Sequence, residues 1–300
     1  MDRRSFLSAV AAGPLAAALK PGNAAASSSY AGVSVQTFVW SQVYQKQGKD
    51  VKDHLGEVFG EIASAGYDGV ETMTTYTETP KDANQLKDLL KQHRLTLTGL
   101  YRGGILHVED QAKKTVKEIE ASARAAADLG CHHLIVNPAT THDHEKTEDE
   151  LRCQAKYLNE AGALTKALSV SLDLHFHAPE MKNNAREFRW NMDETDPELI
   201  HLCADVHWMY RGGADTYGLL EKYGSRLRGT HLRNSVNGIW SEDLSEGDLD
   251  YTRIARLLQD AEYPGYLTVE LAYEKETPET RSLAENIKRS REFIRQVFGA

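Results

Sequence analysis

Four short stretches of the chain end an apolar run with histidine and carboxylate side chains, which are common ligands of divalent metal ions. In a strand, alternate residues share one face, so Asp173, His175 and His177 would point to the same side. The pattern predicts a cage of nitrogen and oxygen donors around one divalent ion if the stretches meet. These stretches are LDLHFH (172–177), CADVHW (203–208), GTHLRN (229–234) and TVEL (268–271).

The apolar flanks of these stretches indicate strands that are buried on both faces. An inward carboxylate in such a strand must be paired, protonated or bound to a metal, because an isolated buried charge is costly. A single residue of this kind could belong to a structural ion pair, but four at the same end of adjacent strands favour a metal site. The alternative is a hydrogen-bonded polar cluster without a metal.

The stretches fall within a regular alternation of β-branched or aromatic runs and amphipathic helical patterns. Residues 178–197 are expected to be irregular. The predicted strands are 33–40, 69–72, 95–101, 131–137, 169–177, 202–207, 228–233 and 266–271. The predicted helices are 51–65, 82–93, 111–129, 147–168, 197–201, 217–223, 251–261 and 278–298.

Alternating strands and helices imply parallel strands joined by right-handed crossovers. Eight such units predict a single α/β domain over residues 30–300, a (β/α)₈ TIM barrel. Active sites of such barrels lie at the carboxyl ends of the strands. The four stretches therefore fall where chemistry is expected.

The first residues have the pattern of a twin-arginine signal peptide. Arg3 and Arg4 precede an apolar run over residues 7–19, and small residues follow at 24–26. The run is shorter than the roughly 20 apolar residues that span a bilayer. We expect residues 1–26 to be a cleaved signal, and the mature protein to be periplasmic or otherwise exported.

Composition narrows the class of partner. The formal charge is −9, with 44 acidic against 35 basic side chains, which disfavours nucleic acid and anionic membranes. Three cysteines without metal-binding spacing are expected to be buried free thiols: Cys131, Cys153 and Cys203. The expected partner is a small sugar or polyol, and assembly into a homo-oligomer is left open.

Four stretches resemble the xylose isomerase-like TIM-barrel superfamily, which includes sugar phosphate isomerases and epimerases, hydroxypyruvate isomerase, ketose 3-epimerase and inosose dehydratase. They are CADVHWMYRGGAD (203–215), GTHLRN (229–234), EGDLDY (246–251) and GYLTVEL (265–271). The resemblance implies one divalent ion, such as Mn²⁺, Mg²⁺, Co²⁺ or Zn²⁺. Its usual ligands are Glu, Asp, His and Glu on the last four strands. Asp205, His231 and Glu270 match, whereas His175 stands at the position of the first Glu.

The histidine at 175 alters the expected chemistry. Epimerases of this group exchange the substrate proton between two glutamates on opposite sides, and here one of them is missing. Two carboxylates and two neutral histidines also leave a dication with more Lewis acidity. Proton removal next to a carbonyl, giving an enediolate, is assigned to Glu270, His175 or His177. The exported location and His175 favour elimination from a keto-sugar or glycoside.

Five further residues are candidates for binding the substrate, each with a structural alternative. Arg233 could hold a hydroxyl or an anion, or form a rim salt bridge. Glu180 could bind substrate or be a solvated loop residue, and Glu71 could instead pair with an arginine. Trp208 and Trp40 could stack on a sugar, although large aromatics more often belong to the core.

Two other functions remain open from the sequence. A phosphodiesterase like endonuclease IV would share the barrel but would need further metal ligands on strands two to four, where the chain offers Glu71, Tyr101 and Asn137. A periplasmic sugar-binding barrel without activity would have no need for Glu270. His142 and His144 resemble metal ligands, but a charged loop is the expected setting.

Overall fold

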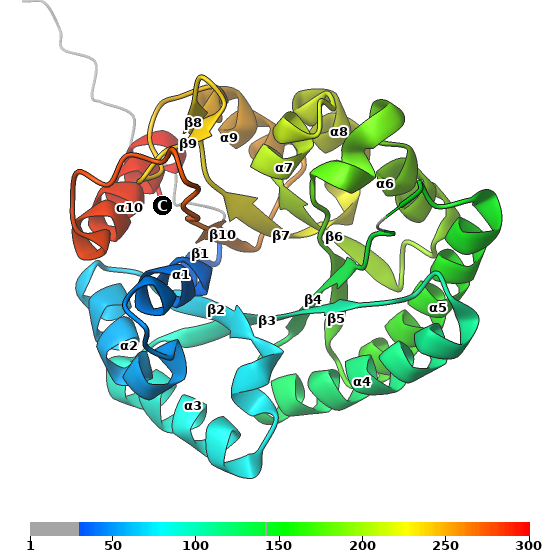
Figure 1. Cartoon of the computed structure of the whole chain (residues 1–300), viewed down its shortest axis with the longest axis horizontal. Coiled ribbons are helices and arrows are strands. Elements are labelled where there is room, and N and C mark those ends of the chain that lie inside the picture. Colours follow the sequence, from blue (N-terminus) through cyan, green and yellow to red (C-terminus); the bar gives the residue numbers. More distant parts are fainter. Residues whose placement is uncertain (1–29, 142) are drawn as a thin grey trace, which may run out of the picture.

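Eight parallel strands close into a barrel in the computed structural model, which describes residues 30–141 and 143–300. The order around the barrel is β1-β10-β7-β6-β5-β4-β3-β2, so the predicted (β/α)₈ TIM barrel is confirmed (Figure 1). The expected signal at residues 1–26 lies outside the described residues. The strands are β1 Gly32–Gln36, β2 Gly69–Met73, β3 Thr96–Gly104, β4 His133–Pro138, β5 Ser171–Leu174, β6 Ile200–Asp205, β7 Leu227–Leu232 and β10 Tyr266–Val269.

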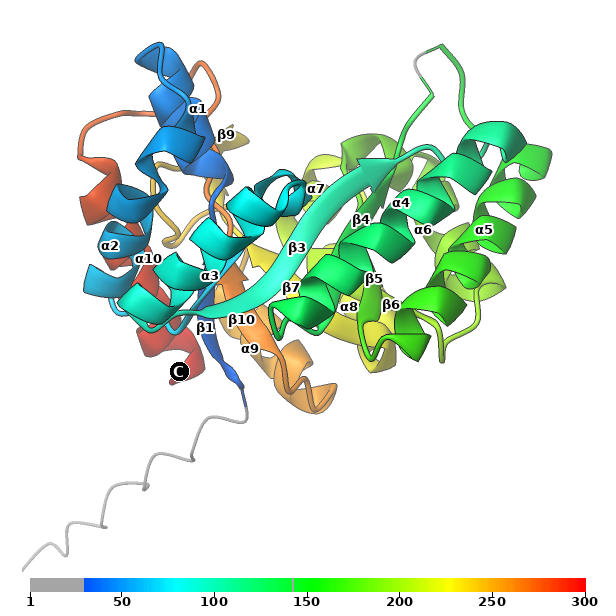
Figure 2. The same ribbon diagram turned by 90° about the horizontal axis from the view of Figure 1, so that it is seen from below.

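Helices surround the barrel and cover the outer face of the strands (Figures 1 and 2). Several begin at side-chain caps; Thr147, for example, forms a reciprocal capping box with Glu150 at the start of α5. The helices are α1 Phe38–Lys46, α2 Leu55–Ser64, α3 Pro80–His93, α4 Glu109–Asp128, α5 Glu148–Ala167, α6 Lys182–Glu194, α7 Val206–Arg211, α8 Thr216–Tyr223, α9 Tyr251–Asp260 and α10 Leu283–Phe298. No helix among the described residues has both the length and the apolar character needed to cross a membrane.

Four short 3₁₀ helices and one hairpin complete the described part of the chain. The hairpin strands, β8 Ser235–Val236 and β9 Ile239–Trp240, are antiparallel and follow β7 at the carboxyl end of the barrel. Asn237 and Gly238 both have positive φ, as the tight turn requires. The 3₁₀ helices are η1 Val51–His54, η2 Thr74–Thr77, η3 Ala178–Met181 and η4 Gly224–Arg226.

Several of the predicted elements are wrong in extent or type; the strand predicted at 169–177, for example, covers only Ser171–Leu174. The first strand ends at Gln36 rather than at residue 40, because Phe38 begins α1. The segment expected to be irregular contains η3 and α6. The helix predicted at 197–201 is absent, because the carbonyl of Asp196 accepts hydrogen bonds from the N–H groups of Leu199 and Ile200 and closes a turn before β6.

The barrel closes between the first and the last strand of the chain. Val33 of β1 pairs with Leu267 of β10 in parallel register. Next to this closure, the ring of Tyr30 lies 6.0 Å from that of Phe298, in the last residues of α10. The two ends of the described barrel are therefore in contact.

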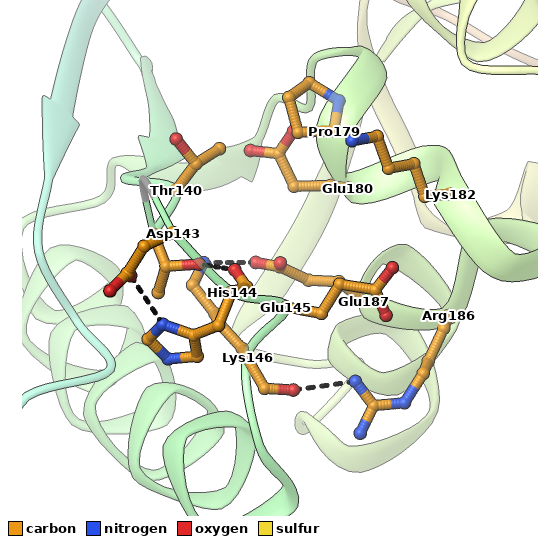
Figure 3. A pocket seen from close by; sticks show the side chains of 11 residues that line it. Thr140, Asp143, His144, Glu145, Lys146, Pro179, Glu180, Lys182, Arg186 and Glu187 are labelled. Atoms are coloured by element: carbon orange, nitrogen blue, oxygen red, sulfur yellow. Dashed lines mark hydrogen bonds and ion pairs between the residues drawn. The ribbon is translucent and has the colours of Figure 1, made fainter.

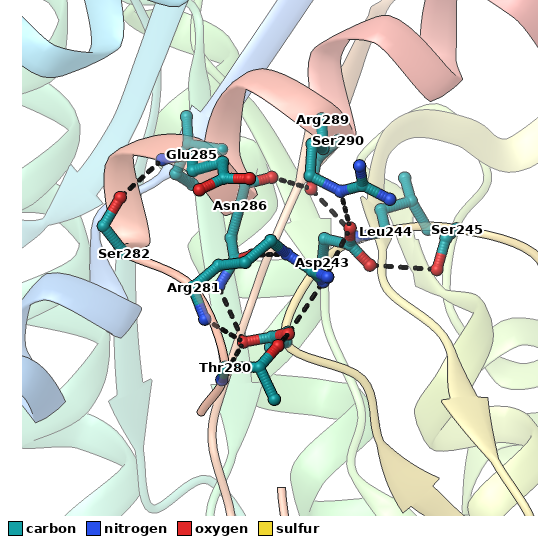
Figure 4. A network of polar contacts seen from close by, with 12 residues as sticks. Asp243, Leu244, Ser245, Thr280, Arg281, Ser282, Glu285, Asn286, Arg289 and Ser290 are labelled. Carbon is teal, nitrogen blue, oxygen red and sulfur yellow. Dashed lines mark hydrogen bonds and ion pairs between the residues drawn. The ribbon is translucent and has the colours of Figure 1, made fainter. Parts of the chain in front are cut away.

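A polar network fastens the loop after β9 to the start of α10 (Figure 4). The carboxylate of Glu242 accepts hydrogen bonds from the backbone N–H groups of Thr280 and Arg281, at 2.9 and 3.2 Å. Asp243 lies beside it and pairs with both Arg281 and Arg289, at 3.1 and 2.6 Å. Because these contacts hold residues 280 and 281, they fix the far end of the loop that follows β10.

Removing the hydrogen bonds of the Glu242 carboxylate should destabilise the whole barrel. We expect Glu242→Ala to lower the free energy of unfolding by about 2–4 kcal/mol, since several donors, among them the buried amide of Asn286, lose a buried acceptor together. Urea unfolding followed by circular dichroism measures this. The matched control is Glu279→Ala, which removes an exposed pair with Lys46 and should have little effect. Equal unfolding midpoints for the two variants would contradict the role given to Glu242.

Candidate metal centre

Four side chains converge at the carboxyl ends of β5, β6, β7 and β10. One ligand atom from each of His175, Asp205, His231 and Glu270 lies within 4.8 Å of every other, and all four residues are buried. His175 directly follows β5, where its backbone N–H donates to the carbonyl of Val136 at 2.9 Å. The structure thus brings together the four residues that the sequence predicted as ligands.

Their donor atoms fit a divalent cation. Although buried, both ring nitrogens of His175, Nδ1 of His231 and Oε2 of Glu270 make no hydrogen bond within the described part of the chain. Buried polar atoms left in this state each cost about 1–3 kcal/mol. Two imidazoles and two carboxylates form a donor set that suits ions such as Mn²⁺, Co²⁺ or Zn²⁺.

Glu71 of β2 orients one of these ligands. Its Oε1 lies 2.8 Å from Nε2 of His231, which leaves Nδ1 of His231 facing Glu270 at 3.3 Å. A carboxylate that holds the second nitrogen of a metal-binding histidine is a common arrangement. The prediction that Glu71 binds substrate is therefore corrected: this buried carboxylate is occupied by His231, across the barrel interior.

Arg233 places a positive charge among the carboxylates. Its Nη2 lies 2.5 Å from Oδ2 of Asp205 and 3.1 Å from Oε2 of Glu270. Burial alone would raise the pKa of Asp205 and of Glu270, but the charge of Arg233 and the contacts with the neighbouring histidines together outweigh burial and lower both pKa values. Both side chains are therefore ionised at neutral pH. Arg233, predicted to bind substrate, shares the inward face of His231 and contacts two candidate ligands.

Aromatic side chains form a wall beside the ligands. The ring of His177 lies 4.8 Å from that of His175 and 5.2 Å from that of the partly exposed Trp208. Trp240 of the hairpin packs edge-on against Trp208, and the guanidinium of Arg233 lies over both indoles. Burial lowers the pKa of His177 to about 4, with a further contribution from the charge of His175, so His177 is neutral near pH 7.

Trp40 is not part of this wall. It lies in α1, is 1% exposed, and donates its indole N–H to Glu61 of α2 at 2.8 Å. The prediction that Trp40 stacks on a sugar is corrected to a core role between the two helices. The reason is local: because β1 ends at Gln36, the residues after it turn with helical rather than strand periodicity.

Glu180 follows the candidate ligand His175 by five residues and is buried. Its Oε2 accepts a hydrogen bond from the backbone N–H of His177 at 3.1 Å, and its Oε1 lies 3.4 Å from Nδ2 of Asn137. The same Nδ2 donates to the carbonyl of His175 at 3.0 Å. Burial and the charge of Glu187 raise the pKa of Glu180 to about 7.

Sequence reasoning did not assign Trp240, Asn137 or Tyr101 to this site. The ring of Tyr101, near the end of β3, lies edge-on at 5.3 Å from that of His175. His144 contacts Asp143 and Glu150 in an exposed loop, and His142 lies outside the described residues. All three cysteines are free, as predicted, but Cys153 is only partly buried, whereas Cys131 and Cys203 are buried as expected. Tyr101 and Asn137 could be recognised in the sequence as residues at strand ends. The side chains that they contact in the fold could not be inferred.

The closed barrel and the polar cluster at the carboxyl ends of its strands define a TIM-barrel protein with an enzyme-type site. The chain belongs to the xylose isomerase-like TIM barrel family, whose model matches residues 59–297. This match confirms the resemblance carried by the four sequence stretches.

Individual relatives are distant. The chain is 24% identical to an inosose dehydratase of Geobacillus kaustophilus over 245 residues, which cover 71% of this chain and 79% of the relative. Among solved structures, a sugar phosphate isomerase/epimerase from Parabacteroides distasonis has a TM-score of 0.71 at 18% identity, covering 92% and 98% of the two chains. A 3-keto-D-glucoside 4-epimerase from E. coli has a TM-score of 0.65 at 16% identity, covering 90% and 98%. These structural neighbours show the shared fold.

Proposed function

We propose that this protein is a metal-dependent enzyme that removes a proton next to the carbonyl of a keto-sugar or related polyol. The observation that carries the proposal is the convergence of four buried ligand-type side chains, one ligand atom from each lying within 4.8 Å of every other: His175, Asp205, His231 and Glu270. Relatives named as inosose dehydratases and structural neighbours named as sugar isomerases or epimerases support the substrate class.

A divalent ion held by these residues would act as a Lewis acid on the substrate carbonyl. The side chains of the chain supply the rest. Ionised Glu270 is available as the base, because Arg233 lowers its pKa and its Oε2 faces the ligand set. His177 is neutral and adjoins Trp208 at the partly exposed wall, where both can contact a sugar ring.

Elimination fits this set of side chains better than epimerisation. Epimerisation needs a second proton carrier on the opposite side of the substrate carbon, which in the family is a glutamate. His175 occupies that position here, and its Nε2 lies 3.4 Å from Oδ2 of Asp205, within the converging group of candidate ligands. The enediolate would then expel a substituent from the next carbon, as in a dehydratase or a keto-glycoside lyase.

Proton exchange tests the proposal directly. The protein is incubated with Mn²⁺ in D₂O together with unphosphorylated keto-sugars and keto-glycosides, and the products are followed by NMR. We expect deuterium at the α-carbon and an unsaturated product from a keto-glycoside. A clean C3 epimer would overturn elimination. Lack of any exchange across the panel would overturn the proposed function.

The arrangement of the candidate ligands supports one metal ion rather than several. Among residues 30–141 and 143–300, one group of three or more His, Cys, Asp or Glu has ligand atoms this close together. Glu71 is bonded to His231, and the amide of Asn137 is bonded to the carbonyl of His175. These contacts leave the positions considered for a multi-metal phosphodiesterase engaged in other roles.

Export remains a proposal that rests on the sequence. We expect protein recovered from the periplasm to begin near Ser27, and Arg3→Lys combined with Arg4→Lys to retain the protein in the cytoplasm. Mass spectrometry of the intact periplasmic protein measures where the mature chain begins. A matched control is Arg94→Lys, outside the signal, which should leave export unchanged. Periplasmic protein that still carries Met1 would contradict a cleaved signal.

A further inference from the structure

A polar pocket lies at the segment that follows the candidate ligand His175, and Glu180 is one of its lining residues. Its volume is about 330 Å³, within the range of small-ligand sites. The loop between β4 and α5 and the segment from η3 into α6 enclose it. Figure 3 shows Pro179 and Glu180 across the pocket from Lys146 and Arg186.

The lining chemistry narrows the class of ligand. Ten of the eleven lining residues are polar, and Pro179 is the exception. Three are Lys or Arg and four are Asp or Glu, so the lining offers both donors and acceptors without an excess of positive charge. Such a lining disfavours a phosphate, which needs a cluster of cations, and an apolar group, which needs hydrocarbon walls. It suits the many hydroxyl groups of a neutral sugar.

The pocket walls are tied in place. Asn183, Asn184 and Ala185 all have left-handed backbone conformations, which cost energy in residues other than glycine. Hydrogen bonds to the facing loop offset this cost. Nδ2 of Asn183 contacts both carboxylate oxygens of Glu145 at 2.6 and 2.7 Å, and Nη1 of Arg186 donates to the carbonyl of residue 146 at 2.7 Å.

An ion pair also fixes two of the residues that line the pocket, Lys146 and Glu187. Lys146 is buried and forms an ion pair with Glu187 at 2.5 Å. Nε2 of the buried Gln154 donates to the same carboxylate at 3.0 Å. The pocket is therefore present before any ligand arrives, which reduces the ordering cost of binding.

The carboxyl group of Glu180 connects the pocket to the segment that carries the candidate ligand His175. Glu180 lines the pocket, and the same side chain accepts from the backbone N–H of His177, two residues after His175. A molecule that spans the pocket and the metal centre would pass this carboxyl group.

We propose that the pocket binds the leaving group of the substrate, a second sugar ring or similar neutral polyol, and that Glu180 donates a proton to it. The inference rests on the proposed elimination. Glu270 takes the α-proton, the bond between the β-carbon and the glycosidic oxygen breaks, and its electron pair goes to the oxygen. Glu180 gives that oxygen a proton, so the products are an unsaturated keto-sugar and an alcohol. No oxidant or reductant is consumed.

The protonation state of Glu180 agrees with this role. Burial and the charge of Glu187 raise the pKa of Glu180 to about 7, so a substantial fraction carries a proton near neutrality. The chemistry also places the carbonyl two carbons from the anomeric carbon, because the carbon between them must carry the acidic proton. The substrate class is therefore a 3-keto-glycoside with a hydroxylated aglycone.

Binding can be tested without turnover. Calorimetry on the Mn²⁺-loaded protein compares cellobiose and maltose with methyl glucoside, none of which carries the reactive carbonyl. We expect one disaccharide to bind at least about tenfold more tightly than methyl glucoside. Thr140→Trp, which fills the pocket, should abolish this preference, and Lys182→Ala should reduce it if the first variant fails to fold. Thr252→Trp on α9 is the matched control and should retain it.

Equal affinity for disaccharide and methyl glucoside, no measurable binding of either, or a preference that survives Thr140→Trp would each overturn the subsite. The binding preference is measured independently of turnover, so it can succeed or fail separately from the proposed function. If wild-type protein turns over no keto-glycoside while the binding preference holds, the elimination mechanism fails and the pocket remains a sugar site.

The role of Glu180 is tested by varying the leaving group. We compare Glu180→Gln with wild type on 3-keto-glucosides of methanol and of 4-nitrophenol. The amide keeps the acceptor for His177 but has no proton of suitable acidity. We expect a loss of about 100-fold for the methyl glycoside and less than about tenfold for the nitrophenyl glycoside, whose leaving group needs no protonation. Equal losses on both substrates would show that Glu180 is only structural.

Discussion

Replacing Glu270 with Gln is expected to lower α-proton exchange about 10³-fold, because the amide keeps the size of the side chain but has no useful basicity. The structure places this carboxylate at the end of β10, with Oε2 facing His231 and Arg233 at 3.3 and 3.1 Å. Exchange into a keto-sugar in D₂O, followed by NMR in the presence of saturating Mn²⁺, measures the effect.

Glu274→Gln provides the control for this variant. Glu274 lies four residues later in the same segment, but its carboxylate pairs with Arg211 and accepts from the backbone N–H of Trp240. Its replacement should leave exchange within a few-fold of wild type. Exchange that persists in the metal-loaded Glu270→Gln variant would show that another group is the base.

Replacing His175 with Ala is expected to weaken Mn²⁺ binding by on the order of 100-fold or more, since even residues that only orient metal ligands are worth 10–100-fold. The variant is informative because neither ring nitrogen of His175 makes a hydrogen bond in the described structure. Loss of the imidazole removes a ligand and breaks one long contact, from Nε2 to Oδ2 of Asp205 at 3.4 Å. Calorimetry with Mn²⁺ measures affinity, and the metal-dependent rise in Tm provides a second readout.

His177→Ala is the matched control, because His177 is adjacent to His175 yet outside the converging group. It should retain the affinity for Mn²⁺. His175→Glu should also retain it, since it restores the usual ligand of the family, but should turn over more slowly because the site becomes more negative. Unchanged affinity in His175→Ala would remove His175 from the ligand set.

The sequence predicted the barrel and the converging residues because both follow from local rules. Asp205, His231 and Glu270 each sit at the end of an apolar strand, and parallel strands of a barrel end on one side. The contact between Glu71 and His231 could not be predicted in the same way. It joins two residues 160 positions apart and depends on which side chains meet across the interior.

Other failures have local causes. Trp40 was assigned to a strand, because the apolar run 33–40 continues past the point where the backbone turns into α1. Helix α6 includes left-handed residues near its start, which no helical periodicity reveals. The hairpin that carries Trp240 did have a readable signal, since Asn-Gly between short apolar residues favours a tight turn. The ion pairs of Arg233 depend on the assembled site.

The contact between Tyr30 and Phe298 at the closure of the barrel has a further consequence. Because β1 pairs with β10, the ring of strands is continuous and has no structural beginning. The ends of the described chain could be joined by a short linker and new ends opened in an exposed loop, with every strand pair kept. In biosynthetic terms, the same closure means that the last strand must leave the ribosome before the first is paired on both edges. Nascent chains of this protein therefore expose an open edge of β1 until synthesis is nearly complete, which makes early protection by chaperones valuable.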